Sequence, residues 1–207
     1  MFEHSIKNLY IGKVYEYSYD FRNSSVSAVQ NEWWTISNTS TLNFWSNWMR
    51  ATNNTNSTLT KSANLTNANK IQITANVNLT TWDKTWAIVT WMCLNTSWDN
   101  NFALWRIWAS TYISRIIDNI GNYQWNWSDN YYSWTGTSWS QTLKIVYDLG
   151  AKTMTSYRIL NWAEISKTST LSDTQVSNIK ACQYWRIELD AWTWWAYISD
   201  IDILVEY

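Results

Sequence analysis

Apolar and polar residues alternate with a period of two along much of the chain. The segment IQITANVNL at residues 71–79 is the clearest case, because its odd positions are aliphatic and its even positions are polar. Successive side chains of a β-strand point to opposite faces, so this pattern predicts a strand with one buried and one solvated face. Similar alternation is found at residues 144–149, 153–160, 163–168, 184–190 and 197–207.

Other segments are almost continuously apolar, which we interpret as strands in the middle of a sheet. They lie at residues 87–94, 102–107 and 112–117. Polar breaks recur about every 8–12 residues, a spacing typical of sandwiches and barrels. We therefore predict an all-β fold, an antiparallel β-sandwich of two sheets. We expect a single domain at residues 15–207, preceded by an N-terminal extension at residues 1–14.

Two regions depart from the strand pattern. Residues 171–179, LSDTQVSNI, predict a short helix, because Ser172 has Gln175 three positions later in the spacing of a capping box. Residues 38–70 are polar and contain few aliphatic side chains, so we expect loops with short strands there.

The balance of charge argues against several classes of partner. The chain has 15 lysines and arginines and 16 aspartates and glutamates, for a formal net charge of -1. This near-balance gives no electrostatic reason to expect nucleic acid or an anionic membrane as a partner. No apolar run approaches the roughly 20 residues of a membrane span. The opening residues are interrupted early by Glu3 and His4, so we expect no signal peptide.

Tryptophan is abundant where glycine is expected. The chain has 19 tryptophans, 4 glycines and no proline. Asn161-Trp162 joins two alternating segments, where Asn-Gly would be the strongest signal for a hairpin. The other suspect contexts are residues 44–49, 95–101, 123–130, 137–141 and 191–195.

One hypothesis accounts for this exchange of glycine for tryptophan. A residue other than glycine in the left-handed region costs roughly 1–2 kcal/mol, so about eight such positions would cost as much as a domain's whole stability of ~5–15 kcal/mol. The codon UGA is read as tryptophan in one variant genetic code and as glycine in that of certain uncultivated bacteria. We therefore interpret many of the tryptophans as recoded glycines; the alternative is a genuinely tryptophan-rich surface.

With Trp162 read as glycine, residues 143–168 resemble the concanavalin A-like jelly rolls, including laminin-G-like domains. The matching features are Tyr147-Asp148, Gly150, Tyr157 and Asn161-Trp162. The closing segment AYISDIDILVEY resembles the last strand of that family, and residues 20–37 resemble its first strand, with Trp34 as a true tryptophan. The resemblance implies a sandwich fold and is compatible with lectins and with glucanases.

The N-terminal segment NLYIGKVYEYSYDFRNSSVS is similar to the start of accessory modules on structural proteins of tailed phages. This resemblance implies a virion protein, for example on a tail fiber, that is assembled in the host cytoplasm and exposed after lysis. It also implies other virion proteins as partners, and it leaves the oligomeric state open. The function expected is non-catalytic binding of host-surface glycans. The alternatives are a structural or decoration domain without a sugar site and a glycoside hydrolase.

A catalytic site is not expected. Glu188 and Asp190 begin the Glu-x-Asp-x-(x)-Glu strand of laminarinase-type glucanases, but the third carboxylate is missing. His4 is the single histidine, so no Ser-His-Asp or Cys-His arrangement is available. The two cysteines, Cys93 and Cys182, are interpreted as buried free thiols.

Calcium is the one metal that the composition allows, although we expect no cofactor. Jelly-roll lectins often hold Ca²⁺ with loop oxygens, which here implies Asp83, Asp99 and Asp129 as weak candidates. Calcium takes six to eight oxygen ligands, and no local run of the sequence supplies them.

The best candidate for a ligand site is the segment NYQWNWSDNYYSWTGTSW at residues 122–139. Sugars pack their C–H faces on aromatic rings and need polar partners for their hydroxyls. This segment supplies both, and its tyrosines remain even if its tryptophans are glycines. The predicted ligand-binding residues are Tyr123, Asn126, Asp129, Asn130, Tyr131 and Tyr132.

Overall fold

The fold is given by a computed structural model of the 207-residue chain. The structure describes residues 14–46, 48–51, 57–79, 89–93, 101–103, 105–108, 111–114, 139–160, 163–189 and 196–207. The statements below concern these residues.

The larger of two main sheets has eight antiparallel strands. Along its length the order is β13-β12-β11-β6-β15-β4-β3, and β1 also pairs with β15. The strands are β1 (Val14–Asp20), β3 (Leu42–Phe44), β4 (Met49–Ala51), β6 (Lys70–Leu79), β11 (Trp139–Asp148), β12 (Thr153–Leu160), β13 (Ala163–Thr170) and β15 (Ala196–Glu206).

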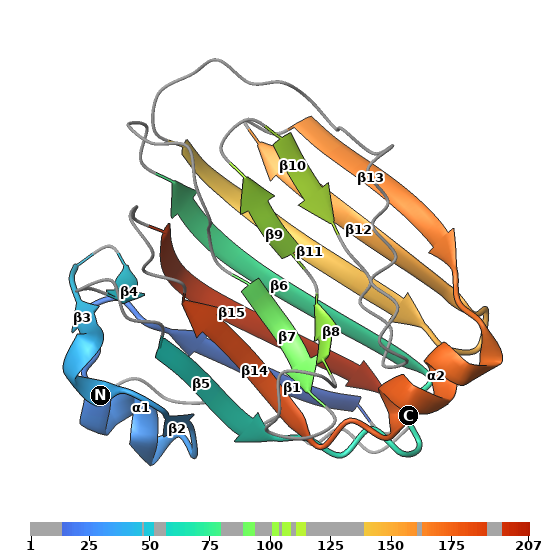
Figure 1. The fold of residues 1–207 in the computed structure, drawn as a ribbon, viewed down its shortest axis with the longest axis horizontal. Coiled ribbons are helices and arrows are strands. Elements are labelled where there is room, and N and C mark those ends of the chain that lie inside the picture. The colour runs from blue at the N-terminus through green and yellow to red at the C-terminus, as the bar shows by residue number, and fades with distance from the viewer. Residues whose placement is uncertain are drawn as a thin grey trace.

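The smaller main sheet has five antiparallel strands in the order β2-β5-β14-β7-β8. They are β2 (Thr35–Ile36), β5 (Ser57–Ser62), β14 (Tyr184–Leu189), β7 (Val89–Cys93) and β8 (Asn101–Ala103). A separate two-stranded sheet pairs β9 (Trp105–Trp108) with β10 (Thr111–Ser114). The two main sheets lie one over the other, with β5, β14 and β7 in front of β6 and β15 (Figure 1). The predicted antiparallel two-sheet sandwich is thus confirmed.

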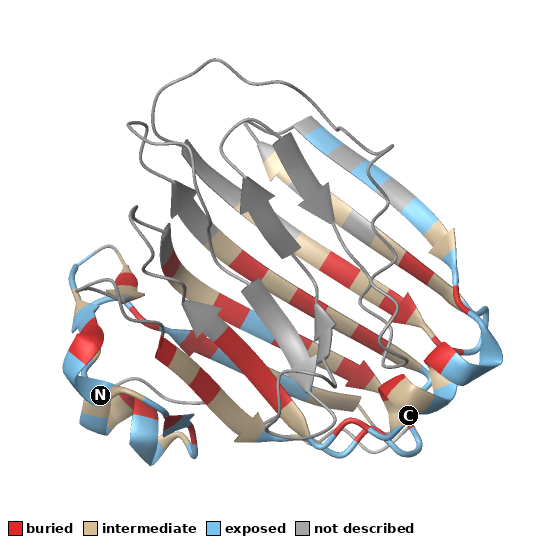
Figure 2. Cartoon of the chain, viewed as in Figure 1, coloured by how far each residue is buried: buried red, intermediate tan, exposed pale blue. Residues whose placement is uncertain are grey.

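The core lies between the two sheets and follows from the period-two pattern. Buried residues alternate along β6 and β15, as the striped strands in Figure 2 show. Ile71 and Ile73 on β6 contribute aliphatic side chains from the larger sheet, and Leu59 on β5 and Ile187 on β14 contribute them from the smaller sheet. Burying such a side chain stabilises a fold by about 1.5–3 kcal/mol, so this alternation is the main source of stability.

The predicted helix at residues 171–179 is confirmed as α2 (Asp173–Lys180). The Ser172 hydroxyl accepts a hydrogen bond from the Gln175 amide at 3.2 Å, and the Gln175 side chain accepts one from the Ser172 amide at 2.8 Å. This is the complete capping box that the spacing predicted.

The interpretation of residues 20–37 as one strand is wrong. The first strand is β1, and residues 20–37 instead contain the helix α1 (Val26–Asn31) and the short strand β2. The helix forms because Ser25 caps its start by accepting a hydrogen bond from the Ala28 amide at 3.1 Å, while Val29 fills the core. Six residues provide fewer than two helical turns, too few for a clear helical period.

Other predictions are confirmed or corrected by the pairing of strands. β12 and β13 form the predicted hairpin, and the pairing of Leu160 with Ala163 leaves only residues 161 and 162 between the strands. Residues 38–70 hold short elements as expected, including the 3₁₀ turn η1 (Thr39–Thr41). The predicted central strands at residues 102–107 and 112–117 are not found there in the described part of the chain, because β8 lies at the edge of the smaller sheet and β9 pairs with β10. An apolar run alone does not fix the place of a strand within a sheet.

Candidate functional site

The residues predicted to bind a ligand lie outside the described part of the chain. This applies to Tyr123, Asn126, Asp129, Asn130, Tyr131 and Tyr132, and also to the calcium candidates Asp83 and Asp99. These assignments therefore stay predictions. The described polar residues instead gather on the outer face of the larger sheet.

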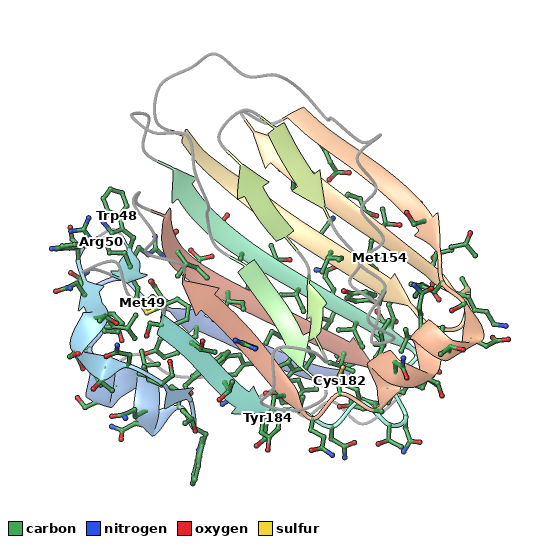
Figure 3. All side chains as sticks on the ribbon, in the orientation of Figure 1. Trp48, Met49, Arg50, Met154, Cys182 and Tyr184 are labelled. Carbon is green, nitrogen blue, oxygen red and sulfur yellow. The ribbon has the colours of Figure 1, made fainter. Side chains whose placement is uncertain are left out.

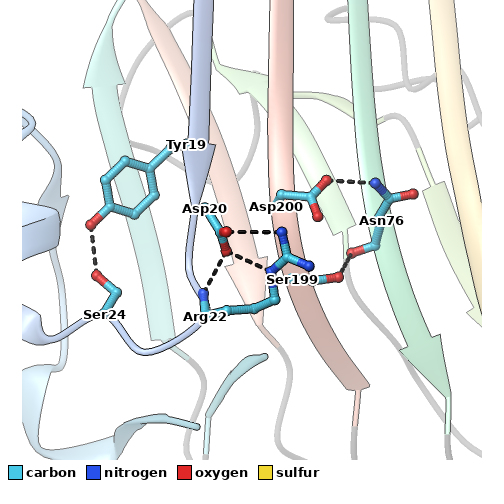
Figure 4. Close-up of polar contacts among 7 residues, drawn as sticks. All are labelled: Tyr19, Asp20, Arg22, Ser24, Asn76, Ser199 and Asp200. Atoms are coloured by element: carbon cyan, nitrogen blue, oxygen red, sulfur yellow. Dashed lines mark hydrogen bonds and ion pairs between the residues drawn. The ribbon is translucent and has the colours of Figure 1, made fainter. Parts of the chain in front are cut away.

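A row of polar side chains crosses four strands on that outer face. The strand register places Asp20 on β1 opposite Asp200 on β15, Asp200 opposite Asn76 on β6, and Asn76 opposite Thr142 on β11. The Asn76 amide donates to the Asp200 carboxylate at 2.6 Å (Figure 4). The Thr142 hydroxyl donates to the Asn76 side-chain oxygen. These side chains face outward because the neighbouring Ala75 and Ile201 fill the core. Alternation therefore places a carboxylate, an amide and a hydroxyl side by side.

The loop after β1 closes one end of this polar row. Arg22 donates to the Asp20 carboxylate through Nε and Nη2, each at 2.8 Å, and through its backbone amide at 2.8 Å (Figure 4). Partial burial raises the pKa of Asp20, but the Arg22 hydrogen bonds outweigh it and leave that pKa below its usual value. Burial raises the pKa of Asp200, and the charges of Asp202 and Asp20 add to the effect.

These contacts show what the polar row does within the fold. The strand β15 has a bulge between Ile198 and Asp200, and the Ser199 hydroxyl donates to the Asn76 backbone carbonyl at 3.1 Å. The Ser199 carbonyl accepts from the Phe21 amide at 2.8 Å. Because Asp20, Asn76 and Asp200 are bound by side chains of the chain itself, we interpret the row as holding the ends of β1, β15 and β6 together. It is not assigned as a ligand site.

A second outward-facing group lies two residues further along β11. The Lys144 ammonium is 3.9 Å from the centroid of the Tyr157 ring and 3.9 Å from the Glu164 carboxylate. Tyr157 is directly opposite Lys144 on β12. Its ring is therefore already in contact with a cation of the same sheet, which makes it a poor platform for a sugar.

An exposed aromatic group lies at the β3–β4 hairpin. Trp45 is 40% exposed, and its backbone amide donates to the Trp48 carbonyl at 2.8 Å across the turn. The Arg50 guanidinium is 4.2 Å from the centroid of the Trp45 ring. Trp48 and Arg50 lie on the outside of the hairpin, whereas Met49 between them is buried (Figure 3). The sequence context predicted glycine at position 45, but φ is not positive there.

The described residues give no support for a catalytic or metal site. No group of three or more histidine, cysteine, aspartate or glutamate residues in the described part could hold a metal ion. Of Glu188 only the backbone is described, in β14 opposite Thr58. Asp190 and His4 lie outside the described residues. Cys182 is a buried free thiol, as predicted; of Cys93 only the backbone, in β7, is described. None of the helices in the described ranges has the length and apolar character to cross a membrane.

Comparison with known proteins gives matches of structure only. No family model and no curated protein sequence matches the chain. The winged bean acidic lectin, solved with methyl-α-D-galactose, is 7% identical, has a TM-score of 0.64, and the match covers 94% of this chain and 99% of that lectin. The chain has the fold of the legume lectins. The CBM2 module of the evolved Dit of Lactobacillus casei BL23 phage J-1 is 11% identical, with a TM-score of 0.60 and coverage of 95% and 98%. A legume lectin-like domain from Entamoeba histolytica is 11% identical, with a TM-score of 0.52 and coverage of 91% and 96%.

The candidate segment lies between two described strands in the chain order. Residues 115–138 connect β10 to β11, and β11 lies between β6 and β12 in the larger sheet. The last residue of the predicted ligand segment, Trp139, is the first residue of β11 and pairs with Leu79. One end of the segment is therefore fixed by the paired strand that carries Thr142 and Lys144.

Proposed function

We propose that this protein is a non-catalytic carbohydrate-binding module. The observation that carries the proposal is a match of fold over almost the full length of both chains with a lectin solved with methyl-α-D-galactose, covering 94% of this chain and 99% of the lectin. A second match of similar extent is a phage CBM2 module. A non-catalytic role agrees with the incomplete carboxylate motif at Glu188.

The proposed sugar site is the segment of residues 122–139. Tyr131 and Tyr132 would supply ring faces for the C–H groups of a pyranose. Asn126, Asp129 and Asn130 would accept and donate hydrogen bonds to its hydroxyls. What supports this choice is composition, together with the finding that the polar and aromatic groups on the outer face of the larger sheet are bound to one another.

We further propose that the module belongs to a phage virion and contacts glycans on the host surface, with other virion proteins as neighbours. The support is the likeness to a CBM2 module of a phage Dit and the similarity of the N-terminal segment to phage accessory modules. Single sugar sites are weak, and several copies on one particle would raise the overall affinity by about 10²–10⁴ through avidity.

Many of the tryptophans are proposed to be recoded glycines. The hairpin register supports this at position 162, because it leaves a two-residue connection between β12 and β13. Two-residue hairpin loops use types I′ and II′, in which at least one residue has positive φ, and Asn-Gly is the favoured pair. Asn161-Trp162 stands where that pair would be.

A glycan array tests the carbohydrate proposal. The protein is produced with glycine at the suspect turn positions, oligomerised on a multivalent carrier, and compared with a Tyr131→Ala/Tyr132→Ala variant. We expect selective binding to a small set of glycans and its loss in the double variant, with the thermal unfolding midpoint unchanged. Absence of any signal from the folded, multivalent protein would contradict the proposal and favour the structural or decoration role. Binding retained by the double variant would move the site away from residues 122–139.

A further inference from the structure

The residue after helix α1 has a backbone conformation that tryptophan rarely adopts. Trp33 has φ 66°, in the left-handed region, directly after the C-cap residue Glu32. Its amide donates to the Gln30 carbonyl at 3.0 Å, which is the bond that the residue after the cap makes in a Schellman ending. Glycine is the usual residue at this position because it has no Cβ to crowd the preceding turn.

The indole of Trp33 is not used by the fold. It is 84% exposed, the higher of the two exposed large hydrophobic side chains among the described residues. The next residue, Trp34, is 2% exposed, and its Nε1 donates to the Tyr17 hydroxyl at 2.8 Å. Its ring centroid is 6.2 Å from that of Tyr17. Two neighbouring tryptophans thus have opposite roles, since one anchors the core and the other projects into solvent from a glycine position.

Neither a positive φ nor exposure is decisive by itself. Asn23 and Lys152 also have positive φ, at 53° and 55°. Asparagine is enriched in the left-handed region, and Lys152 forms an ion pair with Asp173 at 2.6 Å. Trp45 is exposed too, but its φ is not positive and its ring is in contact with Arg50. Among the described tryptophans, Trp33 alone combines a left-handed backbone, a helix-ending position and an unburied ring.

We infer that position 33 is glycine in the natural protein, encoded by UGA, and that Trp34 is a true tryptophan encoded by UGG. The context of residue 33 in the sequence did not mark it as a turn, so this position extends the recoding proposal on structural evidence, the left-handed backbone after a helix combined with an exposed ring. The inference does not depend on sugar binding. It also means that the exposed ring at position 33 is not a platform for a ligand, so recognition must use other groups.

Peptide sequencing of the natural protein is the direct test. Residues 23–50 form one tryptic peptide, because no lysine or arginine lies between Arg22 and Arg50. Fragmentation of this peptide by mass spectrometry distinguishes glycine from tryptophan at each position. We expect glycine at 33 and tryptophan at 34, with UGA and UGG at the corresponding codons. Tryptophan at position 33 of the natural protein, or a UGG codon there, overturns the inference.

A stability series tests the backbone argument independently of the gene. Relative to the chain with Trp33, the Trp33→Gly variant should lower the unfolding equilibrium constant about 5–30-fold in urea titrations, because the left-handed strain is removed. Trp33→Ala removes the indole but keeps a Cβ, so it should recover little of this gain. Trp34→Gly should lose cooperative unfolding or shift its midpoint strongly downward. An equal gain from Trp33→Ala, or no gain from Trp33→Gly, would show that position 33 does not require glycine.

Discussion

The helices α1 and α2 start in similar ways and end in different ways. Each begins after a serine whose hydroxyl accepts from the amide three residues later, Ser25 from Ala28 and Ser172 from Gln175. In α2 the Gln175 side chain also bonds back to the Ser172 amide, whereas Ala28 has no group that could do so. The N-terminal cap of α1 therefore has one of the two hydrogen bonds that the cap of α2 has.

The C-terminal ends differ in the residue that turns the chain. The C-cap residues are alike, with φ -85° and ψ 17° at Glu32 of α1 and φ -84° and ψ -5° at Ala181 of α2. The next residue differs, because Trp33 after α1 is left-handed whereas Cys182 after α2 does not have a positive φ. The Lys61 ammonium donates to the Glu32 carbonyl at the end of α1. A cation is favourable at a helix C-terminus because of the helix dipole. The cation at the end of α1 thus comes from the distant strand β5, whereas α2 has Lys180 in its own last turn.

The buried aromatic residues near the two helices differ as well. At α1, the Trp34 indole and the Tyr17 hydroxyl satisfy each other. At α2, the Tyr147 hydroxyl is fully buried close to Cys182 and has no hydrogen-bond partner among the described residues. A buried polar group without a partner costs about 1–3 kcal/mol. Helix α2 therefore has a complete capping box but lies near a buried hydroxyl without a partner among the described residues. Helix α1 has a single capping bond but lies near a buried indole whose N–H is paired.

The largest effect is expected from Trp34→Ala. Removing a buried tryptophan leaves a cavity and should lower the free energy of unfolding by about 3–5 kcal/mol. It also leaves the Tyr17 hydroxyl without its donor. Urea unfolding followed by circular dichroism measures the loss. Trp33→Ala is the matched control at the adjacent position, and a similar loss there would break the contrast between the two tryptophans.

The contrast between the buried Tyr147 and the half-buried Tyr17 predicts effects of opposite sign. Tyr147→Phe removes an unpaired hydroxyl while keeping the ring, so the free energy of unfolding should rise by about 1 kcal/mol. Tyr17→Phe removes a paired hydroxyl and should lower it by a similar amount. Thermal and urea unfolding of both variants provide the comparison. A loss of stability in Tyr147→Phe would show that this hydroxyl has a partner in the complete chain.

The two N-terminal helix caps should contribute to the free energy of unfolding according to the number of hydrogen bonds that each one makes. Ser172→Ala removes the hydroxyl of a full capping box and should cost about 1–2 kcal/mol, near the upper part of the usual range. Ser25→Ala removes a single bond and should cost about 0.5–1 kcal/mol. Threonine at either position keeps the acceptor and is the control. Equal losses from the two alanine variants would remove the distinction drawn between the helices.

The same difference explains which elements the sequence predicted. The capping box at Ser172 and the alternation at residues 71–79 are local signals, and both elements were predicted with their type correct. Helix α1 was missed because its six residues contain only one of the two hydrogen bonds of a capping box. Its surroundings also depend on Trp34, Tyr17 and Lys61, which only the fold brings together. The sheet positions of residues 102–117 also depend on tertiary pairing that an apolar run does not encode.

The candidate site could be predicted less well than the fold. Composition indicates which segment has sugar-binding side chains, but Tyr123 to Tyr132 have no period that fixes their spacing in three dimensions. The polar row of Asp20, Asn76 and Asp200 was missed for a related reason. Its members come from three strands, and only the register brings them together.

Each helix also has an ion pair beside it, and the smallest predicted effect concerns the pH dependence of the pair before α1. Arg22 binds Asp20 before α1, and Lys152 binds Asp173 at the start of α2. The pKa of Asp20 is lower in the folded chain than its unfolded value of about 3.9. Ionised Asp20 therefore stabilises the fold above that value, and the contribution is lost as the pH falls through the folded pKa.

Asp20→Asn should lower the free energy of unfolding at neutral pH by less than about 1 kcal/mol, since the pair is exposed and screened by solvent. The difference from the unsubstituted chain should shrink as the pH falls from about 5 to about 2, where both chains have lost the charge. Arg22→Gln removes the same pair from the other side and should give the same pH profile, whereas Asp173→Asn tests the pair at α2. A pH-independent difference between Asp20→Asn and the unsubstituted chain would mean that Arg22 holds the loop by geometry alone, because Asp20 is the member of this pair that loses its charge in this range.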